Sequence, residues 1–160
     1  MVKLQTEHLV LVLQTTEEVL ASIEALPAAD QAQVSPAWLA RLRASAAPHP
    51  WTHGFALVDR NTGAIVGRCG FKTPPGDDGG AEIAYGLAPE HQGKGYATEA
   101  AAALTAYAFD TGAVRVVFAH TLPDGTASKR VLTKCGFQFV GEVMDPEDGL
   151  VWRWEKQRGA

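Results

Sequence analysis

The stretch A-E-I-A-Y-G-L-A-P-E-H-Q-G-K-G-Y-A-T at residues 81–98 decides the fold of this chain. Its first part, 81–87, is apolar and rich in strand formers, and Pro89 ends the strand because proline cannot donate to a sheet ladder. Gly93 and Gly95 then permit backbone angles that side chains disfavour. The alanine-rich segment that follows predicts a helix. The stretch is therefore predicted to form a strand, a glycine loop and a helix.

The glycine loop is predicted to bind an anion. The first amide N–H groups of a helix have no intrahelical partner, and the helix dipole adds positive potential around them. Lys94 contributes a mobile cation to the same loop. The expected ligand is a phosphate or pyrophosphate held mainly by main-chain donors.

Two other glycine-loop motifs fit less well. A nucleotide P-loop requires Lys and then Ser or Thr after its last glycine, whereas Gly95 is followed by Tyr96 and Ala97. A dinucleotide-binding fingerprint requires a third small residue at Thr98 and normally an early place in the chain. A glycine turn that enters a helix without any ligand is the plainest alternative.

Length and composition limit how many domains the chain can form and which partners it can bind. A chain of 160 residues is long enough for one domain, 1–160, with its own core. The net charge of -4 argues against a nucleic acid or an anionic membrane as the main partner. No apolar stretch approaches the roughly 20 residues of a membrane span, and Lys3 and Glu7 stand where a signal peptide would be apolar. We therefore expect a cytoplasmic protein that binds neither nucleic acid nor membrane.

The histidines and cysteines do not predict a metal site. The five histidines are scattered without close His or Cys partners at zinc spacing. Cys69 and Cys135 lie far apart, in a predicted strand and at a predicted helix end, so both are expected to be reduced core thiols. No G-x-S-x-G elbow or other nucleophile motif is present.

The order of elements predicts an α+β domain with the pattern β-α-α-β-β-β-α-β-α-β-β. The sheet is expected to be mixed and mostly antiparallel, with about seven strands and helices on both faces. The predicted strands are 4–13, 53–58, 64–71, 81–87, 114–120, 137–143 and 150–155, and the predicted helices begin near residues 15, 35, 97 and 124. The strand 114–120 should run parallel to 81–87 across a right-handed crossover.

The loop 46–53 is broken by prolines and carries an aromatic residue and two histidines. Trp51 is expected either to bind substrate or to cover the edge of the core. His49 and His53 are predicted to lie on the surface. This loop and the two early helices are expected to build the pocket for a second substrate.

Two motifs resemble one known family. The loop Gln92-Gly93-Lys94-Gly95-Tyr96-Ala97 resembles the Q/R-x-x-G-x-G/A loop of the GNAT superfamily of acetyl-coenzyme A dependent N-acetyltransferases, and the order of elements is similar to the GNAT fold over nearly the whole chain. Residues 120–137, H-T-L-P-D-G-T-A-S-K-R-V-L-T-K-C-G-F, resemble the T-x-x-x-N-x-x-S-x-x-x-x-x-K-x-G-F segment of the branch that includes the ribosomal-protein alanine and serine acetyltransferases.

This resemblance implies acetyl-coenzyme A as co-substrate. The pyrophosphate would rest on the main-chain amides of the glycine loop, and the pantetheine arm would run between the splayed ends of strands 81–87 and 114–120. The cofactor-binding residues implied are Leu87, Ala88, Gln92, Gly93, Lys94, Gly95, Tyr96, Ala97, Thr98 and Ser128. The pantetheine amides can extend a sheet edge as a peptide would. Tyr96 could equally be a packing aromatic.

The chain departs from the family at one position, where Gly125 replaces the usual Asn near the cofactor arm. Ser128 is retained, and in the family this position lies near the thiol. We therefore assign Ser128 as the donor to the leaving thiolate, with an ordinary first-turn helix hydroxyl as the alternative.

Direct attack of an amine on a thioester requires a base, an oxyanion donor and a donor for the departing sulfur. Glu82 is the first candidate for the base, because it shares a strand face with the small residues Ala84 and Gly86. A solvated strand-end carboxylate is the alternative role for Glu82. His120 is the second candidate for the base, and Glu99 is expected to be structural.

Three further assignments complete the prediction. A backbone N–H near Leu87 or Ala88 is the expected oxyanion donor, and Tyr85 is expected to point into the core. The predicted activity is acetyl transfer to a primary amine, of a protein N-terminus or a small molecule, through a ternary complex. The alternative is a coenzyme A binding sensor or scaffold without turnover, which Gly125 mildly favours, and a dehydrogenase is weaker still. The sequence leaves a homodimer open.

Overall fold

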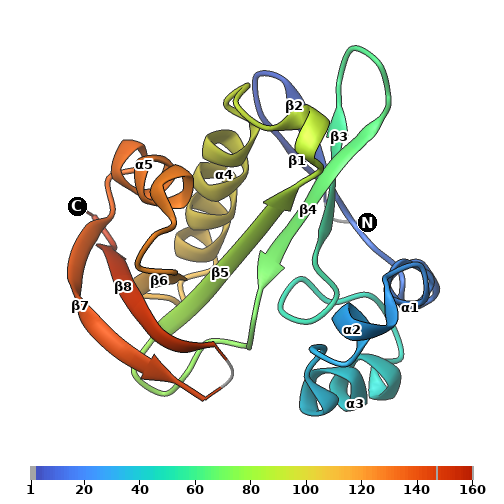
Figure 1. Cartoon of the computed structure of the whole chain (residues 1–160), viewed down its shortest axis with the longest axis horizontal. Coiled ribbons are helices and arrows are strands. Elements are labelled where there is room, and N and C mark those ends of the chain that lie inside the picture. The colour runs from blue at the N-terminus through green and yellow to red at the C-terminus, as the bar shows by residue number, and fades with distance from the viewer. Residues whose placement is uncertain (1–2, 147, 160) are drawn as a thin grey trace.

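A computed structural model describes residues 3–146 and 148–159 (Figure 1). Within these residues eight strands form one sheet in the order β1-β2-β3-β4-β5-β6-β8-β7. The strands are β1 (Lys3–Gln5), β2 (Leu9–Leu13), β3 (Phe55–Asp59), β4 (Ile65–Phe71), β5 (Gly80–Leu87), β6 (Val116–Thr121), β7 (Gln138–Asp145) and β8 (Gly149–Gln157). The helices are α1 (Thr16–Glu24), α2 (Ala28–Gln31), α3 (Pro36–Ala44), α4 (Tyr96–Asp110) and α5 (Thr126–Lys134), with a 3-10 turn, η1 (Pro89–His91).

The sheet is mixed, as predicted. β5 and β6 are parallel and joined through α4, while every other neighbouring pair is antiparallel. The α+β class predicted from the sequence is confirmed. The short helix α2 between α1 and α3 was not predicted.

The strand count is eight in the described chain rather than seven, because the predicted strand 4–13 is two strands. The turn between β1 and β2 is closed by the Thr6 N–H, which donates to the Leu9 carbonyl at 2.9 Å. Glu99 at the start of α4 accepts from the Thr6 hydroxyl and, at 2.9 Å, from the His8 N–H. Glu99 is therefore structural, as predicted. This contact joins residues more than 90 positions apart, so local alternation of apolar residues could not reveal it.

Figure 1 shows helices on both faces of the sheet, with α4 and α5 on one side and α1, α2 and α3 on the other. The α4 face that packs on the sheet is built from small residues, and Ala100, Ala101, Leu104 and Ala108 are fully buried. Small side chains let the helix approach the strands closely. We call the α4–α5 side the cofactor face and the α1–α3 side the acceptor face, after the ligand that the sequence analysis expects on each.

Candidate active site

The sheet opens between β5 and β6. These strands pair only over Gly80–Glu82 and Val116–Phe118, although β5 continues to Leu87 and β6 to Thr121. Beyond Glu82 on β5 and Phe118 on β6, no residue of one strand pairs with a residue of the other. This produces the splayed ends that the sequence predicted.

The hydrogen-bond register of β5 decides which backbone groups face this opening. Toward β4, the Lys72 N–H donates to the Glu82 carbonyl at 2.9 Å and the Ala88 N–H donates to Val66 at 3.0 Å. Because alternate residues of an antiparallel strand bond to the same neighbour, the backbone groups of Tyr85 and Leu87 point away from β4 and into the opening.

This register distinguishes Leu87 from Ala88, the two residues that the sequence analysis offered as the source of the oxyanion donor. The Ala88 N–H is occupied by Val66, so Leu87 is the better placed of the two to donate to an oxyanion. The Leu87 carbonyl accepts from the side chain of Gln92 at 3.2 Å. The Gln92 N–H is occupied as well, by the Pro89 carbonyl. Gln92 thus closes the loop onto β5 and offers no free amide.

The glycine loop matches its predicted geometry. Gly93 and Gly95 have φ values of 79° and 86°, in the left-handed region that favours glycine. Gly95 is the N-cap of α4 and no side chain caps the helix. Within the described chain, the amide N–H groups of residues 93–98 donate to no protein acceptor. Six successive free donors at a helix N-terminus suit the oxygens of a pyrophosphate.

Tyr96 is held by the scaffold. Its hydroxyl donates to Asp59 Oδ2 at 2.7 Å, which fastens the start of α4 to the end of β3. This hydrogen bond raises the pKa of Tyr96 and lowers the pKa of Asp59. Lys94 is exposed and provides the mobile charge beside the loop.

Glu82 lies in a cluster of charged groups and is not a solvated strand-end carboxylate. Its side chain is only 14% exposed, and Oε2 lies 3.4 Å from Lys72 Nζ and 3.3 Å from His120 Nδ1. The same His120 nitrogen is 3.6 Å from Asp145 Oδ2. Within the described residues, Glu82 Oε2 and both ring nitrogens of His120 are buried without a hydrogen bond. Buried polar atoms of this kind retain their capacity to bind a substrate group.

Ser128 lies in the first turn of α5, beside the Tyr85 phenol. Burial raises the pKa of this phenol to about 12, and the neighbouring Ser128 side chain lowers it in opposition. Tyr85 packs against the core, as predicted, but its hydroxyl reaches Ser128, which the sequence did not indicate. Since Tyr85 and Glu82 alternate along β5, Ser128 and Glu82 approach the strand from opposite faces.

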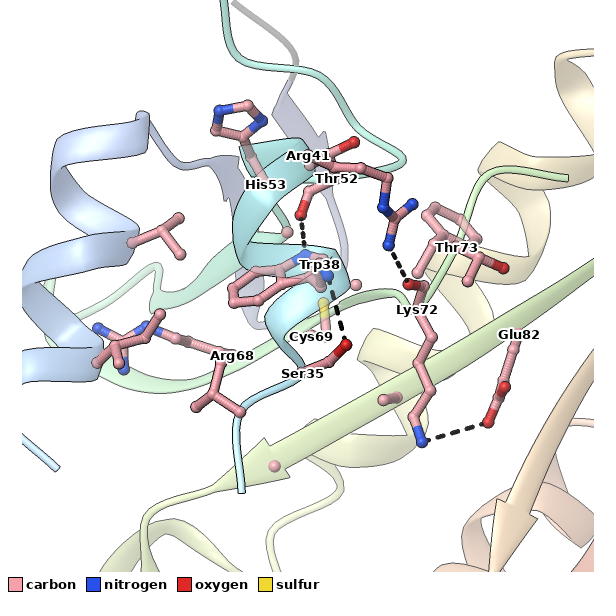
Figure 2. Close-up of a pocket in the computed structure, with 18 of the residues that line it drawn as sticks. Ser35, Trp38, Arg41, Thr52, His53, Arg68, Cys69, Lys72, Thr73 and Glu82 are labelled. Carbon is pink, nitrogen blue, oxygen red and sulfur yellow. Dashed lines mark hydrogen bonds and ion pairs between the residues drawn. The ribbon is translucent and has the colours of Figure 1, made fainter. Parts of the chain in front are cut away.

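A cavity of about 850 Å³ lies on the acceptor face, in front of Glu82 (Figure 2). Its floor carries the small residues Gly70, Ala84 and Gly86, and α3 contributes Trp38. The Trp38 Nε1–H donates to the Thr52 carbonyl at 2.8 Å, which fixes α3 against the loop. Its charged lining residues are Arg41, Arg68, Lys72, Glu82 and Asp145. Sequence reasoning placed this pocket at the early helices but did not find Trp38, the arginines or Asp145.

The prediction for His53 was wrong, because this side chain is only 2% exposed. Its Nδ1 accepts from the His49 N–H at 3.0 Å, so Nε2 carries the proton and donates to the Thr16 hydroxyl at 2.7 Å. Burial lowers the pKa of His53. His49 is exposed, as predicted. Trp51 packs against Phe71, with ring centroids 4.4 Å apart, and covers the core edge.

The described residues 3–146 and 148–159 also bear on metal, thiol and membrane-spanning sites. No group of three or more His, Cys, Asp or Glu side chains there could hold a metal ion. Cys69 and Cys135 are free thiols. No helix in this part of the chain has the length and apolar character needed to cross a membrane.

A sheet that opens beside a helix with free N-terminal amides suits an extended, phosphate-bearing ligand. Residues 2–138 match the family model of the acetyltransferase (GNAT) domain, and the chain belongs to this family. The resemblance to the GNAT superfamily and the GNAT fold that it implied are thereby confirmed.

Three similar proteins place the chain within known sequences and folds. An uncharacterized N-acetyltransferase, p20 of Bacillus licheniformis, is 32% identical over 105 residues, which is 66% of this chain and 54% of that protein. The chain thus spans about half the length of the curated relatives it matches. A ribosomal-protein-S5-alanine acetyltransferase from Vibrio fischeri has the same fold, with TM-score 0.72, 19% identity and coverage of 99% of this chain and 98% of that chain. A ribosomal L7/L12 alpha-N-protein acetyltransferase in complex with coenzyme A gives TM-score 0.71, 18% identity and 98% coverage of both chains.

Proposed function

We propose that this chain transfers the acetyl group of acetyl-coenzyme A to a primary amine by direct attack within a ternary complex. The observation that carries the proposal is the parting of β5 and β6 directly after Glu82. The parted edge offers the backbone of Tyr85 and Leu87 to one ligand, while Glu82 faces the cavity where a second ligand would lie. The acceptor would be the N-terminus of a protein or a small-molecule amine.

The cofactor face suits coenzyme A. The free amides of residues 93–98 would hold the pyrophosphate, and Lys94 would add charge. The two amide groups of pantetheine would pair with the open edge of β5, as an added strand does. The Leu87 N–H, which points into the opening, would then donate to the oxyanion of the thioester and stabilise the transition state.

The chemistry needs one base and one acid. Glu82 would accept the proton of the attacking amine, directly or through His120 at 3.3 Å. The C–N bond forms, the C–S bond breaks, and the departing thiolate would receive the Ser128 proton. Ser128 would take a proton from the Tyr85 phenol, which solvent would reprotonate, and the high pKa of Tyr85 keeps the phenol protonated at neutral pH. No covalent intermediate with the protein is required.

The experiment is to incubate the protein with acetyl-coenzyme A and a panel of primary amines, and to follow free thiol together with acetylated amine by mass spectrometry. Equal amounts of both products are expected. Calorimetry with coenzyme A alone accompanies the assay. Tight coenzyme A binding without acetylation of any amine would overturn the proposal and support a binding protein without turnover.

A further inference from the structure

Two arginines in the acceptor cavity have no carboxylate partner. Arg41 on α3 and Arg68 on β4 both line the cavity, and neither lies within 4.0 Å of a carboxylate oxygen in the described residues. The third cation of the cavity, Lys72, is paired with Glu82 at 3.4 Å. The Glu82 end of the cavity therefore carries two carboxylates, Glu82 and Asp145, beside Lys72, and the positive charge without a carboxylate partner lies at Arg41 and Arg68.

The register of β4 against β5 places these charges along one line. Directly opposed residues of the two strands share a face, and the opposed pairs are Gly70 with Ala84 and Arg68 with Gly86. Glu82 lies four residues before Gly86, so Arg68 is about 13 Å further along the strand pair than Glu82. Figure 2 shows Arg68 and Glu82 at opposite ends of the cavity, with Trp38 between them.

Small residues form the cavity floor between Glu82 and Arg68, so the space above it is open. Gly86 and Ala84 are exposed, and a Cβ added at Gly86 would meet no atom within 4 Å. An extended chain advances about 3.3–3.6 Å per residue, so about three to four residues span this floor. The floor thus fits a short extended molecule beneath Trp38.

Arg41 offers a second place for an anion on the side wall. One guanidinium nitrogen donates to the Lys72 carbonyl at 3.2 Å, which holds the side chain in place and leaves most of its five N–H donors free. A planar guanidinium favours carboxylate geometry. A cationic substrate group would be repelled by Arg41 and Arg68.

We propose that the acceptor is an acidic amine, namely a short peptide segment whose amino group lies at Glu82 and whose carboxylate, about three residues away, lies at Arg68. This inference rests on the proposed acetyl transfer at the same site. The carboxylate belongs either to an acidic side chain or to a free C-terminus, since the chemistry of both is the same. Arg41, on the side wall of the cavity, would attract the same carboxylate.

The test compares kcat/KM for four peptides: Gly-Gly-Gly as the free acid, Gly-Gly-Gly amide, Gly-Gly-Glu amide and Gly-Gly-Lys amide. The carboxylate-bearing peptides should exceed the Gly-Gly-Gly amide by about two- to fivefold, the upper part of the range for an exposed ion pair, and the lysine peptide should be poorest. The free acid and the glutamate peptide distinguish the two sources of the carboxylate.

Single substitutions test which arginine produces the preference for carboxylate-bearing peptides. Arg68→Gln should remove most of it, Arg41→Gln part of it, and Arg68→Glu should shift it toward the lysine peptide. Arg43→Gln, on the same helix as Arg41 but outside the cavity lining, should leave it unchanged. Equal rates for acid and amide peptides, or a preference that persists in the Arg41→Gln, Arg68→Gln double variant, would overturn the inference.

Binding separates this inference from the proposed reaction. Calorimetry of the same peptides in the presence of coenzyme A should reproduce the preference for carboxylate. Retained preference without any acetylation would overturn the acetyl transfer and uphold the charge selection. Acetylation of all four peptides at equal rates would uphold the acetyl transfer and overturn the charge selection.

Discussion

The two faces of β5 are built by different means. On the cofactor face, the proposed ligand groups are backbone amides of residues 93–98, contiguous in sequence and made available by two glycines. On the acceptor face, the cavity is lined by side chains from α1, α3, β4, β5 and the turn after β7. The first face depends on local backbone conformation, and the second depends on long-range packing.

This difference predicts opposite sensitivities. Replacing side chains should have little effect on the glycine loop unless the backbone changes, whereas the acceptor face should respond to single side chains. The four predictions below test that contrast, and the largest effect is expected where both faces meet, at Glu82.

Glu82→Gln should lower kcat for acetyl transfer by roughly 10²–10⁴-fold, the range for loss of a general base. Glutamine keeps the size of the side chain but cannot accept the amine proton. Coenzyme A affinity should be unchanged, because the glycine loop does not depend on this side chain. Thiol release and calorimetry measure the two quantities. Glu90→Gln, an exposed carboxylate in η1, is the matched control, and a Glu82→Gln variant with full activity would exclude Glu82 as the base.

Gly95→Ala should weaken coenzyme A binding by about five- to thirtyfold, because a left-handed φ costs a non-glycine residue roughly 1–2 kcal/mol. The added methyl group would meet no atom within 4 Å, so the effect acts through the backbone alone. Gly112→Ala is the control: its φ is 79°, its added Cβ also meets nothing within 4 Å, and it lies at the other end of α4. Both variants should lose similar stability in urea unfolding, while only Gly95→Ala should lose coenzyme A affinity. Equal affinity in both would remove the loop from the cofactor site.

Gly86→Val should raise the KM for the amine acceptor by about three- to tenfold and leave coenzyme A affinity near the wild-type value. Gly86 has a φ outside the left-handed region, so valine fits the strand backbone and would fill the cavity floor. Gly86→Ala should give a smaller change in the same direction. Unchanged acceptor KM in both variants, measured over a series of amines, would show that the acceptor does not lie on this floor.

The sequence predicted the cofactor face better than the acceptor face, for physical reasons. The strand, glycine loop and helix at 81–110 follow from local rules for proline, glycine and alanine, and all three elements are present. The burial of His53 could not be predicted, because it depends on Thr16 and His49 reaching the same ring from separate segments. The turn at Thr6 depends on Glu99 in the same way.

The residues of the candidate site show the same difference between what local sequence predicts and what only the folded chain brings together. Glu82 was identified from its strand face and its small neighbours, a pattern of period two. Lys72 and Asp145 were missed because Lys72, just after β4, reaches Glu82, and Asp145, at the end of β7, reaches His120, only in the folded sheet. Arg68 lies opposite Gly86 through strand register, which residue spacing does not specify.

The two faces should also respond to acid with opposite sign. Burial lowers the pKa of His53 on the acceptor face, whereas the hydrogen bond to Glu99 raises the pKa of His8 beside the start of α4. A histidine with a lowered folded pKa takes up protons more readily when unfolded, so its contribution to stability is present above the unfolded pKa of about 6.5 and is lost as pH falls below it. The contribution of His8 is present below about pH 6.5 and is lost as pH rises through the raised value.

The free energy of unfolding in urea, measured between pH 5 and pH 8, tests this pair and should show the smallest effect of the four. His53→Gln should flatten the loss of stability below pH 6.5, because the buried ring that resists protonation is gone. His8→Gln should leave the slope below pH 6.5 unchanged and should remove the gain in stability that appears as pH falls through the raised pKa of His8 toward 6.5. The acceptor face should weaken first, so amine KM should rise in acid before coenzyme A affinity changes. A His53→Gln variant with the same pH slope as the wild type would show that the acceptor wall is not the acid-sensitive part of the fold.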